Sequence, residues 1–239
     1  MSSADELFPP THWSLIAAAR EGSGADSAAA LNSLCRAYWQ PLYAFARRRG
    51  VTQDNAADVV QGFLSEFIGR GDLVRSDPQK GRFRSYLLSA FQNYLVSELR
   101  REKAQKRGGG HTFVALEDRE REEAWHQQSA QGMGPEQAYD VRWAQETMRR
   151  ALAKVENDYR RGGNVASFNA LRPALTGEMA EDLGSVGRSL GITAGGVGAA
   201  VFRLRAKFRE ALRFEVSQTV AAPEELEEEV RYLVTLLAQ

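Results

Sequence analysis

The chain has 239 residues, 43 % hydrophobic and 26 % charged, which is the composition of a soluble chain able to bury one medium or two small cores. Its 31 basic residues balance 31 acidic ones, its one cysteine excludes an internal disulfide framework, and its three histidines have no partners at metal-ligand spacing. The sequence lacks both a long apolar run and the basic and apolar regions of a signal peptide, so we expect no membrane insertion, a cytoplasmic location and no cofactor or metal.

The N-terminal part of the chain predicts three helices behind an arm. Residues 1–33 form the arm, with one short helix expected at His12–Arg20. Apolar residues at helical spacing predict the first main helix over Leu34–Arg48. Thr52 is a candidate cap for the second, whose apolar stripe ends at Phe67. The turn-rich stretch GRGDLVRSDPQKGR separates it from a third helix that starts at Phe83.

The third predicted helix ends in a basic cluster. Residues 80–107 contain eight basic and two acidic residues, whereas residues 215–239 contain six acidic and one basic. Three glycines, Gly108–Gly110, then stop the helix. This separation of charge suggests an anionic partner for one face of the protein, although a solvated helix face is the simpler alternative.

The rest of the chain predicts a linker, a second helical domain and a tail. Residues 108–137 are polar, mixed in charge and without a sustained period, as in a flexible linker. A second domain is expected over residues 138–215 and an acidic amphipathic helix over residues 216–239. We therefore expect an all-α fold in which two small helical domains, residues 34–107 and 138–215, are joined by the flexible linker.

The second domain contains a helix-turn-helix pattern in LGSVGRSLGITAGGVGAAVFRLRAKFREAL. Gly187 is small where the second helix must approach closely, Gly191 can end the first helix in the left-handed conformation, and Thr193 can cap the second. Such units place their second helix in the major groove of DNA. A plain helical hairpin is the alternative.

Four segments in this order resemble the sigma-70 family of RNA polymerase sigma factors, in particular the extracytoplasmic-function (ECF) group. The segment CRAYWQPLYAFARRRG is similar to region 2.1 and DNAADVVQGFLSEF to region 2.2. The segment GRFRSYLLSAFQNYLVSELRRE resembles regions 2.3 and 2.4, and LGITAGGVGAAVFRLRAKFREAL resembles region 4.2. The resemblance implies a sigma region 2-like domain and a region 4-like helix-turn-helix domain.

The resemblance also assigns roles to residues. A contact with core RNA polymerase is implied for Asp58, Gln61, Leu64 and Phe67. Contact with the promoter −10 element is implied for Arg82, Arg84, Tyr86, Asn93, Arg100, Arg101 and Lys103. Contact with the −35 element is expected from Thr193, Arg203, Arg205 and Lys207. Aromatic faces, asparagine and a cationic groove are the physical means of holding unstacked bases, whereas arginine and lysine at phosphates position the strand.

Alternatives remain for several of these residues. Asp58 could be only a solvated charge, and Leu64 and Tyr86 could be only core. Three glycines, Gly195, Gly196 and Gly198, weaken the recognition helix by roughly 1 kcal/mol each relative to alanine, and the stretch offers almost no long donors for bases. We therefore expect −35 binding through phosphates with weak sequence discrimination, or a protein partner on this surface.

The function expected from these residues is that of a binding module without catalysis. The chain would bind core RNA polymerase, recognise promoter DNA and help to melt the −10 region, under control of an inhibitory anti-sigma-type protein. The alternative is a sigma-like DNA-binding regulator or protein-bound scaffold that does not itself initiate transcription. No phosphate loop, nucleophile elbow or paired-histidine motif supports an enzyme. The acidic tail at residues 224–229 could fold against residues 203–213 and mask them, or be a solvated helix face.

Overall fold

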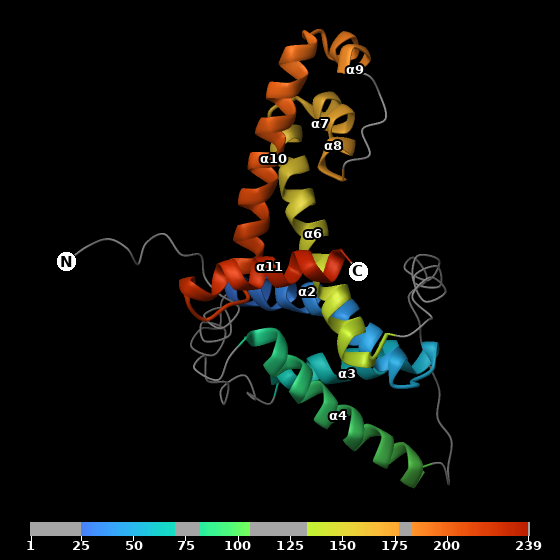
Figure 1. Ribbon diagram of the computed structural model, residues 1–239. Helices are drawn as coiled ribbons and strands as arrows, with labels where there is room; N and C mark the ends of the chain where they lie inside the picture. The colour runs from blue at the N-terminus through green and yellow to red at the C-terminus, as the bar shows by residue number, and fades with distance from the viewer. Residues whose placement is uncertain (1–24, 70–81, 106–132, 177–182, 239) are drawn as a thin grey trace, which may run out of the picture. The chain divides into compact units, whose positions relative to one another are not determined.

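In a computed structural model of the protein, the structure describes residues 25–69, 82–105, 133–176 and 183–238. These residues form helices and their connections, and no strand occurs among them, which confirms the all-α prediction for this part of the chain. Figure 1 labels the helices. In chain order they are α2 (Ala25–Arg48), α3 (Gln53–Gly69), α4 (Phe83–Gln105), α6 (Pro135–Arg161), α7 (Val165–Leu171), α8 (Pro173–Thr176), α9 (Leu183–Leu190), α10 (Ala194–Ser217), the 3-10 helix η3 (Pro223–Glu225) and α11 (Leu226–Leu237).

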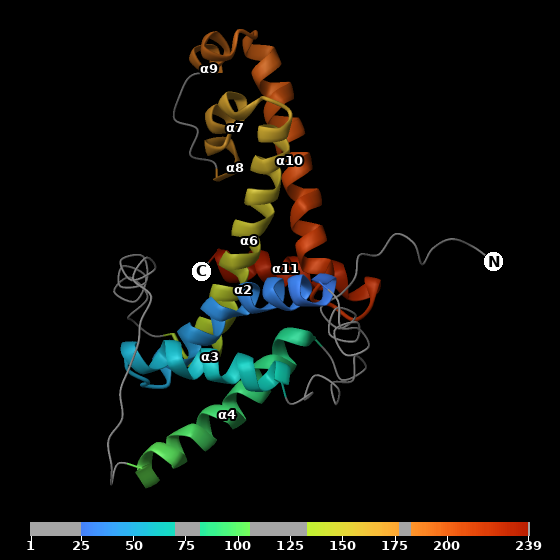
Figure 2. The ribbon, with the colours of Figure 1, turned by 180° about the vertical axis from the view of Figure 1, so that it is seen from behind.

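Contacts divide the chain into two compact units, whose helices Figures 1 and 2 show from opposite sides. The first comprises Met1–Glu146 and Gln218–Gln239, and the second comprises Thr147–Ser217. We expected the second domain to begin at residue 138 and the C-terminal helix to be separate. The division differs because side chains of α11 and of the first part of α6 contact the start of α4. The Tyr139 hydroxyl donates a 3.0 Å hydrogen bond to the Arg84 carbonyl oxygen, and the Arg84 guanidinium lies over the Tyr232 ring.

Several helix boundaries differ from those expected. Helix α2 begins at Ala25 instead of residue 34, since the alanine-rich stretch ADSAAAL favours helix before the apolar spacing becomes visible. Helix α6 begins at Pro135, a residue suited to the first helical position. The short helix expected at residues 12–20, the turn-rich stretch at residues 70–81 and most of the expected linker lie outside the described residues.

The core of the first unit is aromatic. Phe91 of α4 packs its ring against Phe45 of α2, with centroids 5.9 Å apart, and against Phe63 of α3, with centroids 5.0 Å apart. Tyr38 of α2 meets Phe83 edge to face at the start of α4. All five side chains are buried. Such packing holds α3 and α4 in a fixed register, because aromatic pairs combine large buried area with a preferred geometry.

The second unit contains the expected helix-turn-helix. Helix α9 ends at Leu190, Gly191 has a φ of 67°, and α10 starts at Ala194. The Gly196 backbone N–H donates a 3.1 Å hydrogen bond to the Thr193 hydroxyl, so both the left-handed glycine and the threonine cap are confirmed. Within the described ranges, none of the helices combines the length and the apolar character needed to cross a membrane.

Candidate nucleic-acid interface

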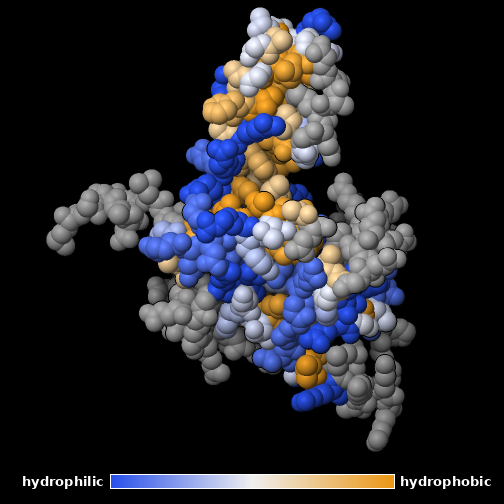
Figure 3. All heavy atoms as spheres, in the orientation of Figure 1, coloured by the Kyte–Doolittle hydropathy of each residue, from blue (hydrophilic) through white to orange (hydrophobic). Residues whose placement is uncertain are grey.

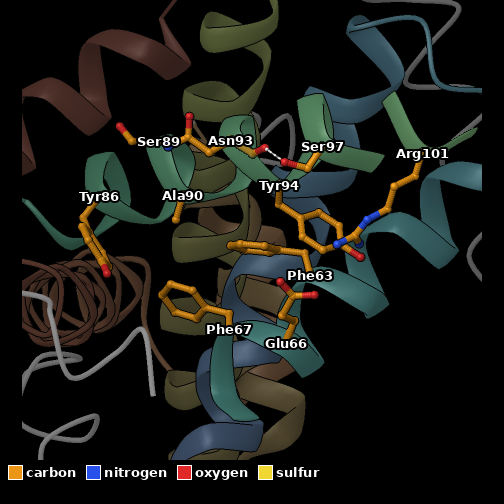
Figure 4. A pocket seen from close by; sticks show the side chains of 10 residues that line it. All are labelled: Phe63, Glu66, Phe67, Tyr86, Ser89, Ala90, Asn93, Tyr94, Ser97 and Arg101. Atoms are coloured by element: carbon orange, nitrogen blue, oxygen red, sulfur yellow. Dashed lines mark hydrogen bonds between the residues drawn. The ribbon is translucent and has the colours of Figure 1, made fainter. Parts of the chain in front are cut away.

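A pocket of about 410 Å³ opens along the facing sides of α3 and α4. Figure 4 shows the side chains around it, with Tyr86 and Arg101 at opposite ends of the α4 row. The lining residues from α3 are Phe63, Glu66 and Phe67, and those from α4 are Tyr86, Ser89, Ala90, Asn93, Tyr94, Ser97 and Arg101. The α4 members recur at three- and four-residue intervals, so one face of the helix supplies them all.

The pocket combines aromatic walls with polar edges. In its walls the Phe67 and Tyr86 rings contact each other with centroids 6.1 Å apart, and the Tyr94 ring packs on Phe63 at 5.5 Å. Asn93 is exposed and offers both amide donors and an amide oxygen. Flat apolar walls with hydrogen-bonding groups at the rim suit a planar, polar-edged ligand such as an unstacked nucleobase.

A glycine determines how close the two walls come. A Cβ atom built on Gly62 of α3 would lie 2.6 Å from the Tyr94 hydroxyl oxygen of α4. No side chain other than hydrogen fits there without displacing the tyrosine. Gly62 therefore allows Tyr94 to lie against α3 and to form part of the pocket wall.

The pocket contains three of the residues expected at the −10 element. Tyr86, Asn93 and Arg101 line it together, although Arg101 also pairs with Glu98 one turn earlier on α4. Arg100 is exposed outside the lining set, and the side chain of Lys103 lies outside the described part of the structure. Tyr86 is half-buried and lines the pocket, so it belongs to a wall and not to the closed core.

Sequence reasoning missed several lining residues. Glu66, Ser89 and Tyr94 were not singled out, and no role was assigned to Ser97. The signal that could have found the α4 members is the helical period that starts from Tyr86 and Asn93. Nothing local marks Glu66, because its position depends on how α3 packs against α4.

Arg82 and Arg84 are held by carboxylates from distant parts of the chain. Glu229 of α11 is fully buried; its Oε1 accepts a 2.7 Å hydrogen bond from Arg84 Nε, and its Oε2 lies 2.9 Å from Arg82 Nε. Asp140 of α6 forms a second ion pair with Arg84, and its other oxygen accepts a 2.8 Å hydrogen bond from the Tyr232 hydroxyl. The start of α4 is thereby tied to both α6 and α11.

The environment of Arg84 stabilises its charge. Burial by itself lowers the pKa of the Arg84 guanidinium, but the charges of Asp140 and Glu229 outweigh this effect and raise the pKa above its ordinary value. The guanidinium is enclosed, so the structure does not present Arg84 at the surface, and its contact with DNA stays a prediction. Glu228 and Glu229 of the acidic tail have Arg82 and Arg84 as partners, so for these two residues neither pairing with residues 203–213 nor a purely solvated face describes the structure.

The four α3 residues expected to meet core polymerase differ in exposure: two are exposed and two are buried. Asp58 and Gln61 are exposed and lie three residues apart, on one face of the helix. Leu64 and Phe67 are buried, so the alternative reading of Leu64 as core holds in this structure. Of the four residues expected at this contact, only Asp58 and Gln61 are therefore accessible in the structure.

The long donors expected at the −35 element differ in whether they have partners within the helix-turn-helix unit. Arg203, Arg205 and Lys207 are all exposed. The Arg205 guanidinium also donates to the Ala174 carbonyl oxygen at 2.8 Å, and Lys207 lies over the Tyr159 ring at 5.2 Å. The Thr193 hydroxyl is occupied by the cap of α10. Three of the four residues expected at the −35 element, Thr193, Arg205 and Lys207, thus also have contacts within the unit that carries them.

The first half of α10 presents small and apolar residues. A Cβ atom on Gly195 or Gly198 would meet nothing within 4 Å, which places both glycines on open surface. Phe202 is 76 % exposed. Figure 3 shows hydrophobic side chains at the surface around α9 and the start of α10. This surface suits close approach by a backbone more than readout of bases through long side chains.

Comparison with known proteins identifies one family. A family model described as ECF sigma factor matches residues 14–189, which is well over half of the chain. The match includes α3, α4 and the pocket between them, and it ends in α9, before α10 begins at Ala194. No curated protein and no solved structure matches the chain.

Proposed function

The chain belongs to the ECF sigma factors, and from this premise we propose that it binds core RNA polymerase through α3 and holds an unstacked base of the promoter −10 element in the pocket between α3 and α4. Sigma factors are DNA-binding transcription initiation factors without catalytic activity of their own. The observation that carries the proposal is the meeting of Tyr86, Asn93 and Arg101 in one pocket.

The proposed melting step follows from the chemistry of the pocket. A base that leaves the duplex loses its stacking partners, and aromatic rings can replace them at about 1–3 kcal/mol per base. Tyr86 supplies such a ring at one end of the pocket, backed by the buried ring of Phe67, and Asn93 supplies a donor and an acceptor for a base edge. Arg101 and the exposed Arg100 provide positive charge for the phosphates of the same strand.

The proposed polymerase contact rests on the exposed pair Asp58 and Gln61. Mixing the chain with core RNA polymerase of its source bacterium should give a complex that co-elutes on size exclusion. The double variant Asp58→Arg with Gln61→Ala should lose it, because a charge reversal at an interface is unfavourable by several kcal/mol. A matched control, Ser65→Ala on exposed α3 surface, should keep it. Absence of any complex would refute the polymerase contact.

The base pocket has its own test. Binding of a fluorescent single-stranded oligonucleotide pool to the full chain, followed by anisotropy, should weaken in Asn93→Ala and Tyr86→Ala. Ser85→Ala, at an exposed position of the same helix outside the pocket lining, is the control. Equal affinity of all four proteins would contradict the proposal.

The surface of α10 favours a second candidate function. Arg205 and Lys207 have partners within their own unit, and the first half of the helix is glycine-rich and apolar. A sigma-like regulator or scaffold that is bound mainly by another protein, such as an inhibitory anti-sigma-type protein, would have this surface. For either activity we propose a location in the cytoplasm. Promoter-dependent transcription by the reconstituted holoenzyme distinguishes the two, since only the first candidate function initiates.

A further inference from the structure

Arg82 continues the row of pocket residues on α4. It caps the helix at its N-terminal end, and its carbonyl oxygen accepts a 3.2 Å hydrogen bond from the Tyr86 backbone N–H. Residues four apart lie on one helix face, so Arg82 lies one turn before Tyr86 on the face that lines the pocket. Asn93 and Arg101 extend the same row toward the C-terminal end of α4. A strand that follows this row past Tyr86 would bring its phosphates to the Arg82 guanidinium.

Two carboxylates of α11 already occupy that guanidinium. Arg82 Nη2 lies 2.9 Å from Glu228 Oε1, and Arg82 Nε lies 2.9 Å from Glu229 Oε2. Carboxylates and phosphates are alternative partners for the same planar fork of donors. The first turn of α11 therefore occupies donors that a phosphate group would need.

The two carboxylates differ in how easily they can be replaced. Glu229 is fully buried and also holds Arg84, so removing it would leave buried charge without compensation. The Glu228 side chain is 67 % exposed and the Arg82 side chain 24 % exposed. Glu228 can turn into solvent while α11 stays in place, whereas Glu229 cannot.

We infer that Glu228 lowers the affinity of the pocket for DNA by competing with a backbone phosphate for Arg82. This inference rests on the proposed function of the pocket. It does not require α11 to detach: DNA exchanges one exposed carboxylate for one phosphate, and Glu229 keeps Arg84 and α11 in place. Glu228 in the first turn of α11 thus lowers the affinity of the start of α4 for a DNA strand.

The test is a charge-matched comparison in the full chain. Affinity for a fluorescein-labelled pool of random single-stranded 12-mers is measured by anisotropy at about 50 mM salt, where phosphate contacts contribute strongly. Glu228→Gln should tighten binding roughly two- to fivefold, the range for an ion pair of this exposure. Glu224→Gln removes the same charge from exposed η3 and should give less than half of that gain.

A double-mutant cycle tests whether the effect of Glu228→Gln acts through Arg82. Arg82→Gln alone should weaken binding, and Glu228→Gln should add nothing in the Arg82→Gln background, because the residue that it releases is absent. Equal gains from Glu228→Gln and Glu224→Gln would show a general charge effect and overturn the inference. So would a gain that persists without Arg82. Circular dichroism of each variant checks that the fold is kept.

The design separates failure of this inference from failure of the pocket. If Asn93→Ala weakens binding but Glu228→Gln leaves it unchanged, the pocket binds DNA and the competition is wrong. If neither the wild-type chain nor Glu228→Gln binds the pool at any salt concentration, both the pocket proposal and the inference fall.

Discussion

Arg84 Nε donates a 2.7 Å hydrogen bond to Oε1 of Glu229, a residue that lies 145 positions further along the chain and is fully buried. The pair connects the start of α4 with the C-terminal helix, and Asp140 of α6 completes it on the other side of the guanidinium. The C-terminal helix is therefore an integral part of the unit that carries the pocket between α3 and α4.

Removing Glu229 should destabilise the first unit strongly. Glu229→Ala leaves Arg84 with one carboxylate and Arg82 with only the exposed one, and breaking a buried pair in this way costs about 3–5 kcal/mol. Glu228→Gln, which breaks a partly exposed pair, should cost at most about 1 kcal/mol. Urea unfolding followed by circular dichroism measures both. Similar losses for the two variants would show that the buried network does not stabilise the unit.

Two kinds of glycine in the helix-turn-helix should respond to alanine in opposite ways. A Cβ atom on Gly187 would lie 2.7 Å from the Ile192 carbonyl oxygen, a backbone atom that cannot move aside cheaply. Gly187→Ala should therefore lower the melting temperature. Gly198→Ala adds a Cβ atom into open space within a helix and should stabilise it by up to about 1 kcal/mol. Stabilisation by both would mean that the close approach at Gly187 is not maintained.

A cation on the open face of α10 tests whether that face meets DNA. Gly198→Lys places a long donor where nothing lies within 4 Å of the new Cβ atom. If this helix meets promoter DNA, binding of a duplex by the holoenzyme should strengthen and become more salt-dependent, with an increase in slope of about one. Gly198→Gln is the uncharged control. Unchanged or weaker binding by the lysine variant would point to a protein partner on this face.

Substitutions of Arg205 and Arg203 should differ in their effect on the stability of the second unit. Arg205 donates to the Ala174 carbonyl oxygen at 2.8 and 3.3 Å, so Arg205→Ala should lower the free energy of unfolding by about 1.5–3 kcal/mol. Arg203 is exposed, and Arg203→Ala should leave stability within about 0.5 kcal/mol. Thermal unfolding and duplex binding are measured together. If Arg205→Ala weakened DNA binding without any loss of stability, its backbone contact would be irrelevant.

Tyr139 should make the protein sensitive to alkaline pH. Burial raises the pKa of the Tyr139 hydroxyl well above its ordinary value. A group whose pKa is raised by folding contributes stability that is complete below its unfolded pKa, about 10 for tyrosine, and is lost as pH rises beyond it. The free energy of unfolding should thus fall above about pH 10. Tyr139→Phe should be less stable at neutral pH, having lost the bond to the Arg84 carbonyl oxygen, but should show a shallower decline. An unchanged slope would contradict this.

The helix-turn-helix was predictable because its signals are local. The left-handed Gly191, the Thr193 cap and the close approach at Gly187 each involve groups at most five residues apart along the chain. The helical periods of α3 and α4 were visible for the same reason, and Tyr86 and Asn93 follow from the period of α4. Such features can be predicted from the sequence because caps and turns depend on neighbouring residues, and a helical period repeats every three or four residues.

Other features of the site required the tertiary structure. The sequence shows that Arg82 and Arg84 are cations near a helix start and that the tail is acidic, but not which of the basic segments the tail meets. Burial of Glu229, enclosure of Arg84 and the entry of Glu66 into the pocket depend on packing between segments far apart in the chain. By itself the sequence determined the helices, their caps and the family resemblance, because these depend on local propensity and period. Only the tertiary structure decided which charges are paired and which remain at the surface, because pairing of distant charges depends on which buried faces bring them within reach.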